Sequence, residues 1–177
     1  SDKTPYSMET LLSQNPEIIF ITSMGKAEKI SRACNLFYND GRAVPWFMSI
    51  CQCLKVRPVV FLEEFSRWLG QKECGKKMGH AEIEKMQVEF LKEFFNSRGK
   101  KNLFEAAENI IRFNGALSRL SDATGEQQVR LSYHPDDLAS MYASDIEFFA
   151  KNCGRYRCTA ICFSTGNGPD WKLAPKG

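Results

Sequence analysis

Three thiols lie within ten residues near the C-terminal end of the chain, at Cys153, Cys158 and Cys162. Thiolates bind zinc when the chain brings them to one tetrahedral ion, and zinc is the cofactor that this cluster would take. The separations of five and four residues are wider than the spacing of most zinc knuckles, so small buried thiols are the alternative interpretation. We therefore treat these cysteines as candidate metal ligands only.

Nucleophilic and acid-base catalysis have little support in the sequence. The chain has two histidines, His80 and His134, and each stands in a polar, turn-like setting without an obvious nucleophile beside it. The chain also lacks a nucleophile elbow, a phosphate-binding glycine loop and a metalloprotease helix. The sequence therefore predicts a protein that is not an enzyme.

Residues 17–38 predict two helices joined by a tight turn at Met24 and Gly25, the outline of a helix-turn-helix. In that motif the second helix enters the major groove of double-stranded DNA. Its polar face offers five candidate DNA-binding residues: Lys26, Lys29, Ser31, Arg32 and Asn35. Arginine and asparagine pair with base edges, and lysine pairs with phosphates. Any helical hairpin with an exposed basic face has the same pattern, so a purely structural role stays open.

The spacing of apolar residues predicts a mainly α fold. The clearest helical pattern covers residues 103–120, and the alternation over residues 127–133 is typical of a strand. We expect a helical domain over residues 8–121 with the helix-turn-helix-like hairpin at its N-terminal end. A small, cysteine-containing α+β segment follows over residues 122–165. Residues 166–177, rich in Gly, Asn, Pro and Lys, are expected to form a loose tail.

Composition limits the class of protein. The chain has 177 residues, of which 43% are hydrophobic and 25% are charged, as in ordinary globular proteins. The net charge of +3 permits nucleic-acid binding without requiring it. No apolar run is long enough to cross a membrane, and no secretory leader is visible. Seven cysteines, an odd number, favour free thiols in a cytoplasmic protein.

Three patches resemble FlhC, the bacterial flagellar master activator of transcription, and its relatives on conjugative elements. Residues 30–32 (Ile-Ser-Arg), followed by residues 36–38 (Leu-Phe-Tyr), are similar to the recognition-helix pattern of that family. Residues 46–49 (Trp-Phe-Met-Ser) resemble its Trp-Phe step, and residues 110–113 (Ile-Ile-Arg-Phe) resemble its Arg-Phe helix. The order and rough spacing agree over about residues 9–121.

The resemblance implies a DNA-binding transcriptional activator that forms a hetero-oligomer with a small FlhD-like subunit and recruits RNA polymerase. The chain departs from the family after Asp122, where the two Cys-x-x-Cys pairs that bind structural zinc are missing. Two alternatives stay open. One is a helical protein-protein interaction or regulatory protein that binds a protein through residues 46–69, and the other is a zinc-dependent sensor.

Overall fold

The structure is a computed structural model that describes residues 16–72 and 77–177, with side chains from residue 25 onward. Its elements are α2 (Pro16–Cys34), the π-helical η1 (Asn35–Asp40), α3 (Phe47–Leu54), α4 (Pro58–Leu69), α5 (His80–Ser97), the short 3-10 helix η2 (Lys101–Leu103), α6 (Phe104–Ser121), β1 (Glu126–Tyr133), α7 (Pro135–Leu138), the 3-10 helix η3 (Met141–Ser144), α8 (Ile146–Asn152), β2 (Arg155–Thr165) and β3 (Gly168–Leu173). The described chain is mainly α with a small β part, as predicted. Residues 8–15 of the predicted helical domain lie outside the described residues.

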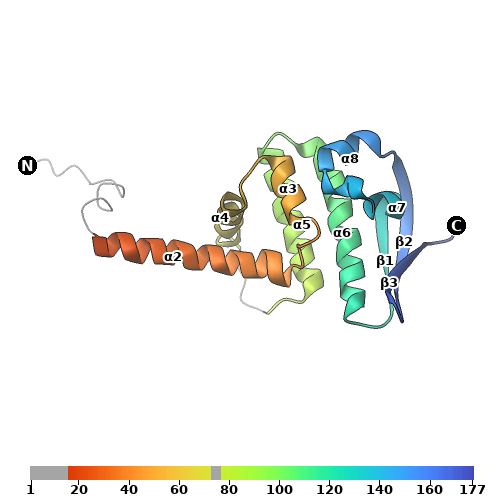
Figure 1. Cartoon of the computed structure of the whole chain (residues 1–177), viewed down its shortest axis with the longest axis horizontal. Helices are drawn as coiled ribbons and strands as arrows, with labels where there is room; N and C mark the ends of the chain where they lie inside the picture. The colour runs from red at the N-terminus through yellow and green to blue at the C-terminus, as the bar shows by residue number, and fades with distance from the viewer. Residues whose placement is uncertain (1–15, 73–76) are drawn as a thin grey trace, which may run out of the picture.

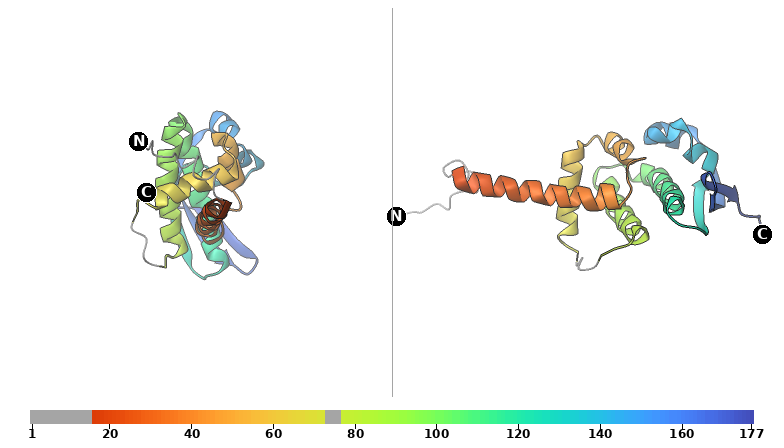
Figure 2. Two further views of the ribbon diagram at one scale, coloured as in Figure 1. Left: turned by 90° about the vertical axis from the view of Figure 1, so that its left-hand side faces the viewer. Right: turned by 60° about the horizontal axis from the view of Figure 1, so that its bottom comes forward.

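The elements form three layers, with α6 in the middle. Helices α2 to α5 lie on one side of α6, and the sheet lies on the other (Figure 1). Figure 2 shows the same order from below, and it shows that the N-terminal part of α2 projects beyond the other helices. Within the described residues, none of the helices combines the length and the apolar character that a membrane span needs.

An aromatic cluster around Phe37 forms the core of the helical layer. The Phe37 ring is fully buried, and its centroid lies 4.8 Å from that of Phe65 and 5.0 Å from that of Phe61. The rings meet edge to face, the arrangement that aromatic quadrupoles favour. Ala33, one turn before Phe37, is also buried. The end of α2 is thereby fixed against α4 and α5.

The sheet is antiparallel in the order β1-β2-β3. Alternate residues of β1, including Val129 and Leu131, are buried against α6 together with Ala160 of β2. Phe113 of α6 is buried, and its ring centroid lies 6.5 Å from that of Trp171 in β3. One sheet face therefore packs on α6 through apolar side chains.

The predicted loose tail is wrong for residues 168–173, which form β3. Gly166 and Asn167 make the hairpin turn, and Gly168 adopts a positive φ of 110°, which glycine reaches without strain. The sequence does not predict this strand, because Pro169 interrupts the alternation of apolar and polar residues that is typical of strands. Proline is tolerated here because β3 lies at the edge of the sheet.

The predicted turn at Met24 and Gly25 is also wrong, because α2 runs through both residues without a break. A glycine inside a helix costs only about 1 kcal/mol relative to alanine, which the good helix formers that follow Gly25 can offset. The helix ends instead at η1 and Gly41, where the Gly41 N–H donates to the Leu36 carbonyl at 3.0 Å. Residues 17–38 are therefore not a helix-turn-helix.

Candidate nucleic-acid interface

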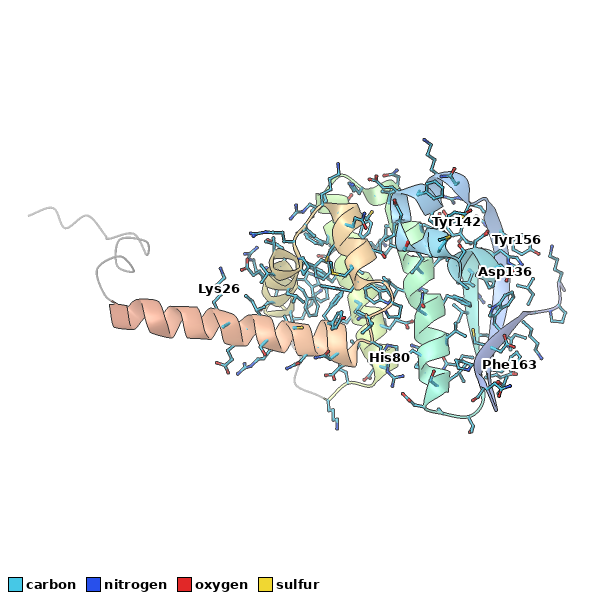
Figure 3. All side chains as sticks on the ribbon, in the orientation of Figure 1. Lys26, His80, Asp136, Tyr142, Tyr156 and Phe163 are labelled. Carbon is cyan, nitrogen blue, oxygen red and sulfur yellow. The ribbon has the colours of Figure 1, made fainter. Side chains whose placement is uncertain are left out.

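A groove of the described chain is lined by α2, by α4 and by residues of the segment 77–83. Its volume is about 1200 Å³. Figure 3 labels Lys26 and His80, which lie toward opposite ends of this groove. Its floor includes the apolar Ile30, Ala33 and Leu36 of α2. We call it the basic groove, because of the charges described next.

Positive charge dominates the lining of the basic groove, in which seven residues are Lys or Arg and two are Asp or Glu. The seven come from separate elements: Lys26, Lys29 and Arg32 from α2, Arg42 from the next loop, Arg67 from α4, and Lys72 and Lys77 from the segment between α4 and α5. The two acidic residues are Asp40 and Glu63. Cations that converge from several elements create a local positive potential that attracts anions.

The cations differ in how they are paired. Lys26 contacts Glu63 at 3.1 Å, and Arg32 contacts Glu28 at 2.6 Å, both as surface pairs. Such pairs contribute little to stability and exchange easily for another anion. Among the described residues, Lys29, Lys72 and Lys77 have no carboxylate within ion-pair distance. These three ammonium groups are the strongest candidates for contact with an external anion.

A row of partly buried, hydrogen-bonded side chains fixes the position of His80 in the basic groove. The His80 Nε2–H donates to the Gly41 carbonyl at 3.2 Å, so Nδ1 accepts from the Arg119 guanidinium at 3.1 Å. Arg119 also contacts the buried Glu84 carboxylate at 2.6 Å. Burial, with Arg119 nearby, lowers the pKa of His80 below 6.5. His80 is therefore a neutral, positioning group and not a cation of the groove.

The turn that follows α2 is held by Gln87 of α5. Its amide donates to the Phe37 carbonyl at 2.7 Å and to the Gly41 carbonyl at 3.1 Å. These bonds satisfy carbonyls that the π-helical turn leaves without helical partners. A Cβ at Gly41 would lie 2.2 Å from the Phe37 backbone carbonyl oxygen, which cannot move aside, so only glycine fits this position. The geometry of the groove at this end is therefore set by α5.

The structure brings three of the five predicted DNA-binding residues together. Lys26, Lys29 and Arg32 line the basic groove, whereas the exposed Ser31 and Asn35 do not. The Asn35 side chain accepts instead from the amide of Asn39, at 2.9 Å. The sequence interpretation missed the other four cations, since nothing in the spacing along the chain relates α4 and the following segment to α2.

The predicted metal site is wrong. Cys158 and Cys162 lie four residues apart on β2, which separates their Cα atoms by about 13 Å. Thiolates on one zinc ion lie within about 4 Å of each other. Burial raises the pKa of Cys162 to about 11 and also raises that of Cys153. Among the described residues, no group of three His, Cys, Asp or Glu side chains could hold a metal ion.

Comparisons with known proteins give no relative. No family model matches the chain, and neither a curated protein nor a solved structure matches it. The likeness to FlhC therefore depends on the residue patterns alone. The structure places Phe37, Trp46 and Phe113 of those patterns in the core. Part of the likeness thus describes packing positions, and the basic groove is the observation that bears on function.

Proposed function

We propose that the chain is a DNA-binding protein that contacts the backbone of double-stranded DNA through the basic groove. The observation that supports this proposal is the excess of seven basic over two acidic residues in one groove. Duplex DNA carries one negative charge per about 1.7 Å of its axis, and basic side chains bind it by releasing its counterions. The proposal gives the chain a binding role and no chemical step.

The side chains of the groove divide by their chemistry. Lys29, Lys72 and Lys77 provide point charges for phosphates, which position the protein without reading sequence. Arg32 lies on the same helix, and 77% of its side-chain surface is exposed. Its planar fork can leave the surface pair with Glu28 and bind a guanine edge with two hydrogen bonds. Arg32→Ala should weaken specific binding by about 1–3 kcal/mol.

The role of a cytoplasmic transcriptional activator is part of the same proposal and is supported by the resemblance to FlhC. It requires a hetero-oligomer with a small FlhD-like subunit and a contact with RNA polymerase. The continuous α2 means that the DNA contact would not be that of a helix-turn-helix. A weak affinity of the isolated chain that rises when a small subunit is added would agree with this role.

A second candidate is a protein-protein interaction protein that uses the surface around α3 and α4. Met48 of α3 is 60% exposed and Val59 of α4 is 45% exposed, although the aromatic residues Trp46 and Phe61, two positions away from them, are buried. Exposed apolar side chains of this size are common singly and mark an interface only when they form a patch. DNA binding with a steep salt dependence favours the first candidate.

The test compares two variants with equal loss of charge. In the groove variant, Lys29, Lys72 and Lys77 become Gln. In the control variant, three exposed lysines outside the groove become Gln: Lys85, Lys92 and Lys101. Affinity for a fluorescein-labelled DNA duplex is measured by anisotropy at low salt. We expect the groove variant to bind at least about tenfold more weakly than the control variant.

Because both variants lower the net charge equally, a general electrostatic effect changes them alike. Equal affinities would place the DNA contact elsewhere. If the parent chain binds no duplex at low salt, with or without a small partner subunit, the DNA-binding proposal is wrong and the interaction protein takes its place. Circular dichroism on each variant checks that the helices are intact.

A further inference from the structure

A second pocket lies near the C-terminal end of the chain, about 490 Å³ in volume. Tyr156, which lines it, is labelled in Figure 3 on the side of the molecule opposite to Lys26 of the basic groove. Strands β1 and β2 and residues 173–176 form its walls. The volume falls within the range of small-molecule sites. The pocket is therefore separate from the basic groove in place and in size.

The pairing of β1 with β2 brings the polar side chains of this pocket close together. Arg130 of β1 is directly opposite Thr159 of β2, so their Cβ atoms are about 5 Å apart. The chain neighbours Leu131 and Ala160 are buried, so Arg130 and Thr159 lie on the opposite face of their strands. Arg157, two residues from Thr159, shares this face. Two guanidinium groups and a hydroxyl thus stand on one side of the sheet. Arg130 stands on the edge strand and also lines a cavity with Glu105 and Glu108 of α6.

A β-bulge stands at the same place. The register shifts between Leu131 and Tyr133, which pair with Cys158 and Arg155, so β2 has one extra residue here. Such a bulge twists the strand and turns the adjacent side chains in a new direction. Arg157 is one of the two residues within the bulge. The local backbone is therefore arranged around this pocket.

The charge of the pocket has one sign. Arg130, Arg157 and Lys176 line it, and none of its lining residues is Asp or Glu. Within the described chain, none of the three has a carboxylate at ion-pair distance. The Lys176 ammonium lies over the Tyr156 ring, 5.4 Å from its centroid. Ser132 and Thr159 add hydroxyl groups to the lining.

We propose that this pocket binds the phosphate of a small phosphomonoester, with Arg130 and Arg157 as the recognising groups. Arginine binds phosphate with paired, charge-assisted hydrogen bonds, and hydroxyl groups complete the set of donors. Three cations match a phosphate dianion better than a carboxylate, which carries a single charge. The site does not depend on the basic groove or on DNA binding there.

The test uses isothermal titration calorimetry of the full chain with inorganic phosphate, with AMP, and with an oligonucleotide that lacks terminal phosphates. We expect phosphate and AMP to bind, and the oligonucleotide not to compete at this pocket. The variant Arg130→Gln/Arg157→Gln should bind AMP at least about 100-fold more weakly, since each lost charge-assisted hydrogen bond costs about tenfold.

The matched control is Arg57→Gln/Arg98→Gln, which removes the same charge from exposed arginines outside the pocket and should bind AMP like the parent. Equal AMP affinity of the two double variants would overturn the proposal. No heat with phosphate or AMP at about 10 mM, a weak millimolar limit, would overturn it as well. If the oligonucleotide binds at this pocket and phosphate and AMP do not, the ligand of the pocket is a nucleic-acid backbone and the phosphomonoester proposal is wrong. Unchanged thermal unfolding of both variants confirms that they are folded.

Discussion

Replacing Arg119 with methionine should destabilise the protein by about 3–5 kcal/mol, because it leaves a buried carboxylate without its counter-charge. The Arg119 guanidinium lies 2.6 Å from the Glu84 carboxylate, and the two side chains are 19% and 11% exposed. Its Nε also donates to the Gln127 side chain at 2.9 Å. Arg119 links α6 to α5 and to β1, so its loss affects all three layers.

The assay is urea unfolding of a double-mutant cycle. Arg119→Met and Glu84→Met are measured singly and together, since replacing a whole buried pair by apolar residues of similar volume is often nearly neutral. We therefore expect each single variant to lose about 3–5 kcal/mol and the double variant to lose clearly less than their sum. The coupling free energy reports the pair itself.

Arg112→Met provides the control, because Arg112 pairs with Glu108 on the helix surface at 2.7 Å, with 46% of its side chain exposed. A surface pair of this kind contributes at most about 1 kcal/mol. A cost of Arg119→Met no greater than that of Arg112→Met would contradict a buried, paired Glu84 carboxylate. A cycle without coupling would contradict it as well, because Glu84 would then not need Arg119.

Three further predictions concern the core, the pH dependence and the cysteines. Phe113→Ala should cost about 3–5 kcal/mol in urea unfolding, because the ring is 1% exposed and its removal leaves a cavity; near-parental stability would contradict the packing described. The folded state depresses the pKa of His80 below 6.5, so the unfolded state binds more protons just below that pH. His80 therefore makes stability fall as the pH falls below 6.5, and His80→Asn should remove this part of the slope in pH-dependent melting, whereas an unchanged slope would assign it elsewhere. Because the three cysteines do not converge on one metal ion, chelators should leave the melting temperature unchanged within about 1 °C. Changing Cys153, Cys158 and Cys162 to Ser should likewise not alter the zinc content measured by mass spectrometry. Zinc loss in that variant would restore the cysteine site.

Long periodic segments were predictable from the sequence. The apolar residues of α6 recur at helical spacing over the whole element, and its bounds agree closely with those predicted. The predicted alternation of apolar and polar residues in β1 also agrees with the structure, since alternate residues of the strand are buried. Each signal is local, so it is complete within one stretch of chain. Tertiary packing therefore determines where these elements lie, and not whether they are helix or strand.

The features that the sequence interpretation missed depend on contacts between distant segments. Strand β3 exists because β2 offers it backbone partners and Phe113 offers Trp171 a surface. The basic groove needs Arg67 and Lys77 to come close to α2, and no short-range pattern encodes that approach. The predicted turn at Gly25 is wrong for a different physical reason. A glycine signals a helix end only when the backbone needs a positive φ there, and the helix continues through it.

The salt dependence of DNA affinity tests the central claim most directly. For the parent chain and the groove variant Lys29→Gln/Lys72→Gln/Lys77→Gln, the logarithm of the association constant is plotted against the logarithm of the salt concentration. Each phosphate contact contributes about 0.9 to the slope, so losing three should make it shallower by about 2.7. The control variant Lys85→Gln/Lys92→Gln/Lys101→Gln should keep the parental slope. Equal slopes for the parent and the groove variant, or no binding by the parent at low salt, would contradict the proposal that the basic groove holds DNA.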